Sequence, residues 1–235
     1  MKALFVFAHP DDETFGTGGT IAKLSKKGAT VKLICATRGE AGQRGNPPVC
    51  SQKDLPKVRE LELRNAAKIL GIKEIFFLDF IDGTLHTLPQ QQLVKPILSL
   101  FEKEHPDVVY TFHTNGGESG HTDHISISSA VTDAFALYAR NQRKHVQLYY
   151  RATPLSFLNK LKKKNMVHMP FGKANSTIDA HINTAIDITD VLDKKIAASE
   201  MHKSQHQDWE RIYKRKMFEE FHYEYFLLAA ENKVK

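Results

Sequence analysis

The sequence predicts an α/β fold, a Rossmann-like three-layer sandwich in which helices cover both faces of a mostly parallel sheet of five or more strands. Three observations lead to this prediction. Short apolar runs alternate with amphipathic helical segments through residue 150, which is typical of crossover units around a parallel sheet. The first run, ALFVFA (3–8), is apolar throughout, as in a strand buried on both faces. Two helical segments end at a glycine, as helices often do.

Local patterns give the elements in chain order. After the strand at 3–8, the segment TGGTIAKLSKKG (17–28) predicts a helix that ends at Gly28, and TVKLICAT (30–37) predicts a second strand. A loop rich in turn-forming residues then leads to an amphipathic helix that ends at Gly71. The other elements are expected as strands at 74–80, 107–113, 146–152 and 184–189, and as helices at 57–71, 90–106, 121–141 and, in one or two pieces, 190–218.

No linker interrupts this order, so we expect one domain over residues 1–235. Its core would be residues 1–150, with a C-terminal extension at 151–235 packed on it. In parallel sheets, functional sites form at the carboxyl ends of the strands. Functional side chains are therefore expected among the residues that follow each strand.

Composition limits the class of protein. The 235 residues are 41% hydrophobic and 26% charged, as in an ordinary globular domain. The formal charge of +6 comes partly from lysine and arginine runs that we interpret as solvated surface, so no nucleic-acid partner is expected. The N-terminal apolar stretch is too short for a signal peptide, and no stretch reaches the roughly 20 apolar residues of a membrane helix. Two cysteines without CxxC spacing favour the cytoplasm, and a homo-oligomer stays open.

The segment AHPDDETFGTGG (8–19) places an imidazole and three carboxylates at the tip of the first strand. A dinucleotide-binding loop explains it poorly, because the glycine spacing is wrong and the acids would repel a pyrophosphate. Acids at a helix N-terminus interact favourably with the helix dipole, which could explain Glu13 but not an imidazole beside two aspartates. A divalent cation would relieve the repulsion between adjacent carboxylates. His9 and Asp12, three residues apart across a turn, can face one point.

A third ligand is expected at the end of another strand, because a catalytic zinc typically takes three protein ligands and a water. The segment GHTDH (120–124) follows the strand at 107–113. It offers His121 and His124 one helical turn apart, with Asp123 between them. Together the two segments predict a metal site built from the ends of two strands.

With both motifs in place, the chain resembles the PIG-L/LmbE family of zinc-dependent N-deacetylases, which act on N-acetylglucosaminyl compounds and related amides. The resemblance implies one LmbE-like domain that removes an acetyl group from an N-acetylated amino sugar through a zinc-activated water. Fe²⁺, Co²⁺ or Mn²⁺ could also occupy such ligands. The resemblance spans nearly the whole chain and rests on AHPDDE (8–13), GTGGTIA (16–22), TRGEAG (37–42), RELELRNAAKILGI (59–72), GHTDH (120–124) and HKSQ (202–205).

The resemblance also implies a role for each matching residue. Asp11 would be the general base beside three metal ligands, His9, Asp12 and His124. His121 would support the tetrahedral intermediate.

Three further residues are candidates around these groups. By the same resemblance, the Asp123 carboxylate would orient His121, and Arg59 matches an arginine that contacts substrate in some members. Arg59 can equally be read as an exposed helix cation. Glu40, in TRGEAG beside the first tip, is expected either to bind substrate hydroxyls or to cap the following loop.

Other polar residues near the strand ends receive structural interpretations. Asp82 is explained by the turn IDGT (81–84), and His202 by the packing of a C-terminal helix. The second motif departs from the family pattern in two ways: Thr122 stands where many members have a proline, and NGGESG (115–120) lacks a tyrosine that some members carry. Both departures bear on the identity of the substrate.

Two other functions are kept as alternatives. A metal-dependent phosphoesterase could use the same His/Asp cluster, although such enzymes commonly hold two metals about 3.5–4 Å apart and the sequence shows one set of ligands. A non-enzymatic nucleotide- or nucleic-acid-binding module would bind with a steep salt dependence and would ignore a chelator.

Overall fold

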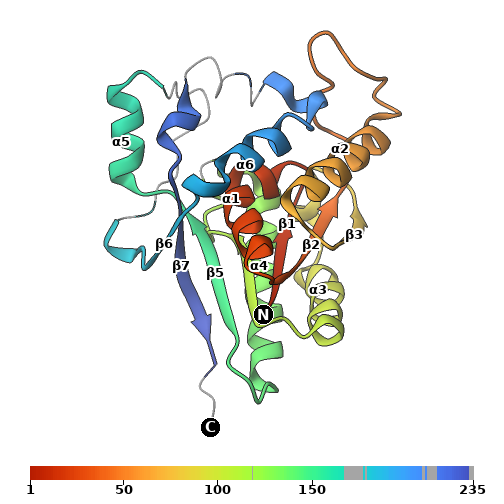
Figure 1. The fold of residues 1–235 in the computed structure, drawn as a ribbon. Coiled ribbons are helices and arrows are strands. Elements are labelled where there is room, and N and C mark those ends of the chain that lie inside the picture. Colours follow the sequence, from red (N-terminus) through yellow and green to blue (C-terminus); the bar gives the residue numbers. More distant parts are fainter. Residues whose placement is uncertain (118, 167–176, 178, 208–209, 211–215, 233–235) are drawn as a thin grey trace.

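A seven-stranded sheet forms the centre of the computed structural model, which describes residues 1–117, 119–166, 177, 179–207, 210 and 216–232 (Figure 1). The strands are β1 (Lys2–Phe7), β2 (Thr30–Thr37), β3 (Glu74–Phe80), β4 (Val108–Phe112), β5 (Gln147–Ala152), β6 (Thr184–Asp187) and β7 (Tyr223–Glu231). Their order across the sheet is β3-β2-β1-β4-β5-β7-β6. The first five strands run parallel, and β7 is antiparallel to both β5 and β6.

Helices cover both faces of this sheet (Figure 1). On one face α1 (Asp12–Lys26), α2 (Leu55–Leu70) and α6 (Leu192–Ser199) pack against one another. On the other face α3 (Gln90–Glu104) packs against α4 (Thr122–Arg140). A short helix, α5 (Leu155–Lys163), lies near the β6–β7 edge of the sheet. The arrangement confirms the predicted α/β class with a mostly parallel sheet.

The strand order reverses between β1 and β4. From β1 the chain winds outward to β2 and β3, and it then returns to place β4 on the other side of β1. Because crossovers between parallel strands are right-handed, the helices before and after this reversal lie on opposite faces. The loops that follow β1 and β4 diverge at the carboxyl edge of the sheet, where ligands bind in folds of this class. Both predicted motifs, at 8–19 and at 120–124, begin there.

β1 is deeply buried in the core after its first residue. Residues 3–8 expose no more than 2% of their surface, which agrees with the unbroken apolar run in the sequence. Phe5 stacks on Tyr110 with ring centroids 4.6 Å apart, and Phe7 meets Phe112 edge-on at 4.9 Å. Each buried aromatic side chain contributes on the order of 1.5–3 kcal/mol. This packing of β1 on β4 fixes the relative position of their carboxyl ends.

The predicted elements through residue 152 agree with the structure to within two residues, except that α1 begins at Asp12 and not at residue 17. β6 lies inside the strand expected at 184–189. Neither α5 nor β7 is predicted from the sequence. β7 pairs with β5 and β6, which lie far away in the sequence, so its extended form depends on tertiary pairing more than on local pattern. The helix expected at 190–218 is shorter: α6 ends at Ser199, and a 3-10 turn follows at Lys203–Gln205. Residues 208–209 and 211–215 of that prediction lie outside the described residues.

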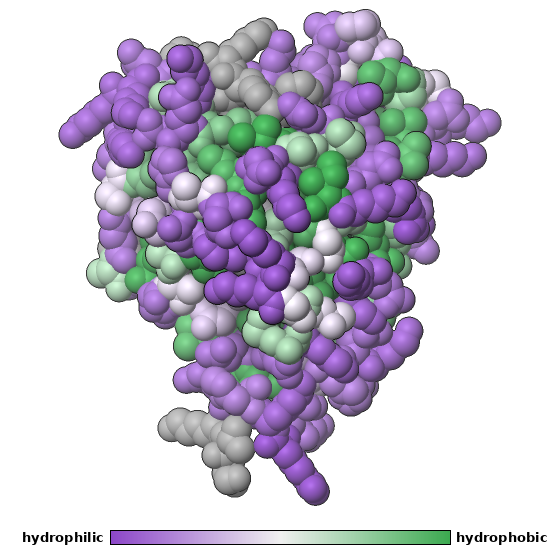
Figure 2. Space-filling view, viewed as in Figure 1, coloured by the Kyte–Doolittle hydropathy of each residue, from purple (hydrophilic) through white to green (hydrophobic). Residues whose placement is uncertain are grey.

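Hydrophilic residues cover most of the face shown in Figure 2, with hydrophobic residues in patches between them. Lys160 of the lysine-rich α5 and Lys164, which follows that helix, pair with Glu220, so part of that charge run is compensated locally. Among the described residues, no helix is both long enough and apolar enough to cross a bilayer.

Two consecutive glycines of α1 allow a test of how tightly this helix packs. A Cβ atom on Gly19 would lie 2.6–2.7 Å from three atoms of Ile188, whereas one on Gly18 would meet Lys195 Cγ at 3.4 Å. We expect Gly19→Ala to lower the free energy of unfolding by about 1–3 kcal/mol through overpacking. Gly18→Ala should leave it unchanged or raise it by up to about 1 kcal/mol, since alanine favours a helix. Denaturant unfolding measures both variants, and equal effects would contradict the packing of α1 on Ile188.

Candidate metal centre

A tight turn between β1 and α1 forms the first half of the site. The backbone N–H of His9 donates to Asp12 Oδ2 at 2.8 Å, which folds the Asp12 carboxylate back towards the end of β1. Asp11, the residue before α1, has φ 107° and ψ −29°, a left-handed conformation that residues with a Cβ atom seldom adopt. The local sequence therefore brings His9 and Asp12 to one side of this turn.

The start of α4 forms the second half. The His124 ring stacks on the buried Phe112 ring at the end of β4, with centroids 3.9 Å apart and an interplanar angle of 7°. His124 Nδ1 lies 3.2 Å from the carbonyl oxygen of Gly116 and 3.1 Å from Ser119 Oγ. Because a carbonyl only accepts hydrogen bonds, Nδ1 carries the proton of the neutral ring and Nε2 presents a lone pair.

The three predicted ligands converge between these halves. His124 Nε2 lies 3.3 Å from His9 Nδ1 and 3.2 Å from Asp12 Oδ1, and His9 Nδ1 lies 3.4 Å from Asp12 Oδ2. For metal–ligand bonds of about 2.0–2.2 Å, tetrahedral ligand atoms lie about 3.3–3.6 Å apart. The observed separations are close to this range, with His124 facing Oδ1 and His9 facing Oδ2 of Asp12.

The far side of the His9 ring faces two carboxylates. His9 Nε2 lies 2.9 Å from Asp82 Oδ1 and 3.4 Å from Asp123 Oδ2, so in the neutral ring Nε2 keeps the proton and Nδ1 is the free donor atom. Burial would lower the pKa of His9, but its hydrogen bonds to Asp12, Asp123 and Asp82 hold that pKa well above its usual value. This environment stabilises positive charge at the imidazole, and a divalent cation would supply such charge.

The chemistry of the donor set fits a metal. Two imidazole nitrogens and a carboxylate suit Zn²⁺ and several other divalent metals. His9 Nδ1 and His124 Nε2 face each other and the Asp12 carboxylate at distances where, without a cation or a proton between them, they repel. His121 is nearby, since one of its ring nitrogens lies within 4.8 Å of ring nitrogens of His9 and His124. His9, His121 and His124 form a group that could hold a divalent metal ion, and His9, Asp82 and Asp123 form another.

Asp11 lies beside this group and contacts a buried cation. Arg59 Nη2 lies 3.0 Å from Asp11 Oδ2 and also donates to the carbonyl oxygen of Pro10 at 2.5 Å. Burial raises the pKa of Asp11 to about 7; the Arg59 charge opposes this shift and the Asp12 charge adds to it. Arg59 itself is only 3% exposed and also bonds the carbonyl oxygen of Gly39. The structure therefore gives Arg59 a supporting role, not that of an exposed helix cation, and its contact with substrate stays a prediction.

The Asp123 carboxylate contacts groups other than the His121 ring among the described residues, and its role in orienting His121 stays a prediction. That carboxylate is fully buried and accepts hydrogen bonds from the backbone N–H groups of Gly83 at 2.7 Å and Leu85 at 3.1 Å, besides facing His9. The His121 ring is held instead by the Asp123 backbone, whose N–H donates to His121 Nδ1 at 3.2 Å. Burial and the nearby charges of His9 and His124 lower the pKa of His121. Because Nδ1 accepts from the Asp123 N–H, the neutral ring carries its proton on Nε2.

Glu40 ties two loops together. Its Oε1 accepts from the Asp82 N–H at 3.0 Å, and Asp82 Oδ2 accepts from the Ala41 N–H at 3.0 Å. The hydrogen bond to Oε1 joins Glu40 to the loop after β3 and not to the loop that follows Glu40, so the expected capping role stays a prediction. The buried Oε2 of Glu40 has no hydrogen-bond partner among the described residues, and substrate binding stays a prediction.

Two contacts of the site are missing from the sequence analysis. Asp82, interpreted as a turn former, also holds His9. Glu13 and His202, interpreted through the helix dipole and core packing, are fully buried and lie 3.0 Å apart beneath Asp11. The motif HKSQ (202–205) pointed to His202, but its spacing in the sequence does not show that Glu13 is the partner of His202.

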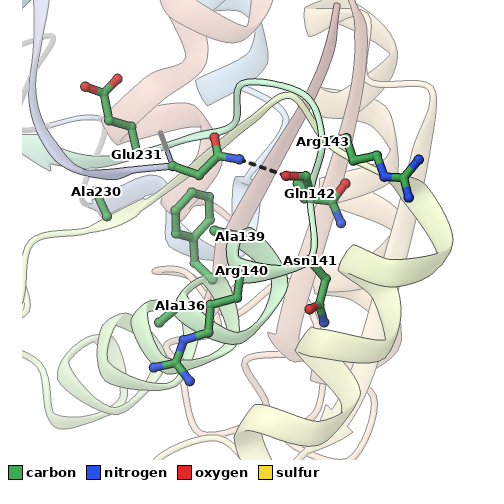
Figure 3. A pocket seen from close by; sticks show the side chains of 10 residues that line it. Ala136, Ala139, Arg140, Asn141, Gln142, Arg143, Ala230 and Glu231 are labelled. Atoms are coloured by element: carbon green, nitrogen blue, oxygen red, sulfur yellow. Dashed lines mark hydrogen bonds between the residues drawn. The ribbon is translucent and has the colours of Figure 1, made fainter. Parts of the chain in front are cut away.

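An open pocket of about 810 Å³ lies elsewhere, between the end of α4 and the end of β7 (Figure 3). It sits near the amino end of β5, where Gln147 pairs with Glu231, and so at the opposite edge of the sheet from the predicted motifs. The side chains of Arg140 and Arg143 extend in different directions in Figure 3, so these two cations form no cluster. None of the predicted site residues lines this pocket.

Comparison with known proteins shows the family of the chain. The family profile described as "PIG-L: GlcNAc-PI de-N-acetylase" matches residues 4–135, which is more than half of the chain. The chain belongs to the PIG-L family. The matched region contains all three residues that converge at close to tetrahedral spacing.

Individual relatives of this PIG-L family protein are named as deacetylases. A probable N-acetyl-alpha-D-glucosaminyl L-malate deacetylase 2 of Bacillus anthracis is 36% identical over 141 residues, which cover 60% of this chain and 62% of that protein. The 1D-myo-inositol 2-acetamido-2-deoxy-alpha-D-glucopyranoside deacetylase of Saccharomonospora viridis is 31% identical over 234 residues, which cover 86% of this chain and 84% of that protein.

Solved structures show the same fold. The N,N'-diacetylchitobiose deacetylase of Pyrococcus horikoshii is similar with a TM-score of 0.66 and 25% identity, covering 98% of this chain and 83% of that one. The 4-carboxy-2-hydroxymuconate hydratase of Pseudomonas putida KT2440 has a TM-score of 0.70 at 18% identity, covering 100% and 98%, and therefore shares the fold alone.

The contact between Asp82 and His9 predicts an effect on metal binding. Asp82 accepts two hydrogen bonds with two oxygens, whereas asparagine offers one oxygen, so Asp82→Asn must turn an N–H₂ group towards one of the two donors. We expect the affinity for Zn²⁺ to fall about 10- to 100-fold, as when other outer partners of a ligating histidine are removed. Competition with a chromophoric chelator measures this affinity. Asp79→Asn, three residues away and exposed, is the control, and an unchanged affinity in Asp82→Asn would refute the assigned contact.

Proposed function

We propose that this PIG-L family protein is a zinc-dependent N-deacetylase that removes the acetyl group from an N-acetylglucosamine-type conjugate. The observation that carries the proposal is the convergence of His9, Asp12 and His124, from two strand ends, at close to tetrahedral spacing. The relatives named as deacetylases of N-acetylglucosaminyl malate and inositol conjugates support this class of substrate. The cytoplasm is the proposed compartment, since Cys35 and Cys50 are both free thiols.

Asp11 is the proposed general base beside these ligands. When bound, the cation would lower the pKa of a water molecule towards 7 and polarise the acetamide carbonyl. The Asp11 carboxylate would accept a proton from a water molecule in the site. Arg59 anchors Asp11 Oδ2, and this anchor fixes the direction of the other carboxylate oxygen.

His121 is the proposed donor to the oxyanion of the tetrahedral intermediate. Its Nδ1 is occupied by the Asp123 N–H, so Nε2–H is the free donor of the neutral ring. A donor of this kind is often worth roughly 3–4 kcal/mol. Asp11, protonated by the water, then gives this proton to the leaving nitrogen; His121 could do so only from its doubly protonated form. The products are acetate and a free amine.

Substitutions of Asp11 and of His9 should distinguish the general base from the metal ligands. Asp11→Asn keeps the size of the side chain and tolerates a left-handed backbone, but it cannot take a proton. We expect it to bind Zn²⁺ like the wild type and to lose about 10²- to 10⁴-fold in kcat. His9→Ala should lose metal and activity together. Elemental analysis with an acetate-release assay measures both properties, and an active Asp11→Asn enzyme would reject the assignment of the base.

Metal removal gives a further prediction. Dialysis against a chelator should abolish acetate release, and one equivalent of Zn²⁺ per chain should restore it, because the three ligands define one site. A requirement for two ions per chain would favour the metal-dependent phosphoesterase instead. Fe²⁺, Co²⁺ and Mn²⁺ tested in the same way identify the metal that gives the highest kcat/KM.

The substrate class is tested by release of acetate from N-acetylglucosaminyl malate, N-acetylglucosaminyl inositol and diacetylchitobiose. The expected result is removal of the acetyl group from at least one of them, with the rest of the sugar compound left intact. Release of phosphate from phosphoester analogues, without release of acetate, would overturn the proposed function.

A further inference from the structure

The backbone at Asp11 needs external support. Its left-handed conformation is seldom adopted by residues other than glycine, and such conformations persist only where the surroundings hold them. Asp11 is also the proposed base, so its backbone sets where its carboxylate can reach.

Two charged side chains form hydrogen bonds with the peptide group between Pro10 and Asp11. Its carbonyl oxygen accepts from Arg59 Nη2 at 2.5 Å, and its N–H donates to Glu13 Oε2 at 2.9 Å. A cation therefore holds one end of this peptide and an anion holds the other. Hydrogen bonds to charged groups are about twice as strong as neutral ones, so these two hydrogen bonds oppose rotation of the peptide.

Glu13 itself requires a partner, because its side chain is fully buried. His202 Nε2 lies 3.0 Å from Glu13 Oε1, and the Thr14 hydroxyl donates to the same oxygen. Burial would lower the pKa of His202, but the Glu13 charge raises it above its usual value. His202 is also fully buried, so it contacts neither solvent nor a substrate in the site.

Residues 202–205, which we call the strap, fasten His202 in place. Ser204 donates from its backbone N–H and its hydroxyl to the two carboxylate oxygens of Glu62, at 2.7 and 2.6 Å. Gln205 Nε2 donates to the carbonyl oxygen of Gln43 at 2.7 Å. Glu62 lies three residues after Arg59, on the same face of α2. The strap thus joins α1, α2 and the loop after β2, the elements that surround the Pro10–Asp11 peptide.

We infer that His202 is a positioning residue for Asp11. Acting through Glu13, and opposite Arg59, it holds the Pro10–Asp11 peptide in the left-handed turn that directs the carboxylate. The catalytic consequence of this role rests on the proposed function; the structural consequence does not.

The test compares three variants of the zinc-loaded full chain. His202→Leu removes the donor to Glu13 and keeps an apolar side chain of moderate size. His202→Gln retains a side-chain N–H donor, and Lys203→Ala changes the exposed neighbour within the strap. Hydrogen exchange of the Asp11 amide, followed by NMR after labelling with ¹⁵N-aspartate, reports directly on the hydrogen bond from this amide to Glu13. Zinc affinity, kcat and KM for acetate release report on the site.

In His202→Leu we expect the Asp11 amide to exchange at least about 10-fold faster and kcat to fall about 10- to 100-fold, as for a misdirected catalytic group. KM and zinc affinity should stay within about threefold, since the metal ligands are untouched. His202→Gln should recover most of kcat, and Lys203→Ala should match the wild type. If His202→Leu does not fold, Ser204→Ala, which loosens the strap from Glu62, should show smaller changes of the same kind.

Unchanged amide exchange and unchanged kcat in a folded His202→Leu protein would overturn the inference. So would a loss of zinc affinity in step with kcat, because His202 would then support the ligands and not the base. A wild-type chain that releases no acetate from any substrate would overturn the proposed function alone, and the exchange rates of the Asp11 amide would still decide the role of His202.

Discussion

Compensation of buried negative charge is the constraint on which the rest of this structure depends. Five carboxylates crowd the carboxyl edge of the sheet where β1 adjoins β4. A buried carboxylate without a partner is strongly destabilising, by about 3–5 kcal/mol when one member of a pair is removed. Each of these carboxylates lies beside an arginine or histidine side chain. Asp11 faces Arg59, Asp12 lies between His9 and His124, Glu13 faces His202, and Asp82 and Asp123 share the far side of His9.

This arrangement explains why one imidazole serves two purposes. His9 turns Nε2 to the carboxylates and leaves Nδ1 for the space beside Asp12. His124 reaches the same state by different means, since a backbone carbonyl holds its Nδ1 and an aromatic ring fixes its plane. Protein contacts alone thus direct the proposed ligand atoms, which would reduce the reorganisation that binding of a cation must drive.

Much of the fold, and the meeting of the two candidate motifs at one edge of the sheet, could be predicted from the sequence, because both depend on short-range patterns. The spacing of His9 and Asp12 across a turn, and of His121 and His124 along a helix, is a local property. The rule that sites form at the carboxyl ends of parallel strands then brings the two segments together. The contacts of Asp82 with His9, and of Glu13 with His202 across 189 residues, are of another kind. They depend on side-chain directions that only packing determines, as does the partner of the Asp123 carboxylate. β7 escaped prediction for the same reason, since its partners are remote in the sequence.

The origin of His202 has a consequence for how the molecule is made. All proposed ligands lie within the first 124 residues, whereas the imidazole that neutralises Glu13 is among the last 34. During synthesis, β1 and α1 leave the ribosome long before the strap does, and chains of this size tend to fold from the N-terminus onward. A nascent chain could therefore gather its ligands early while Asp11 still lacks its support, so metal capture and catalytic competence would be acquired at different moments.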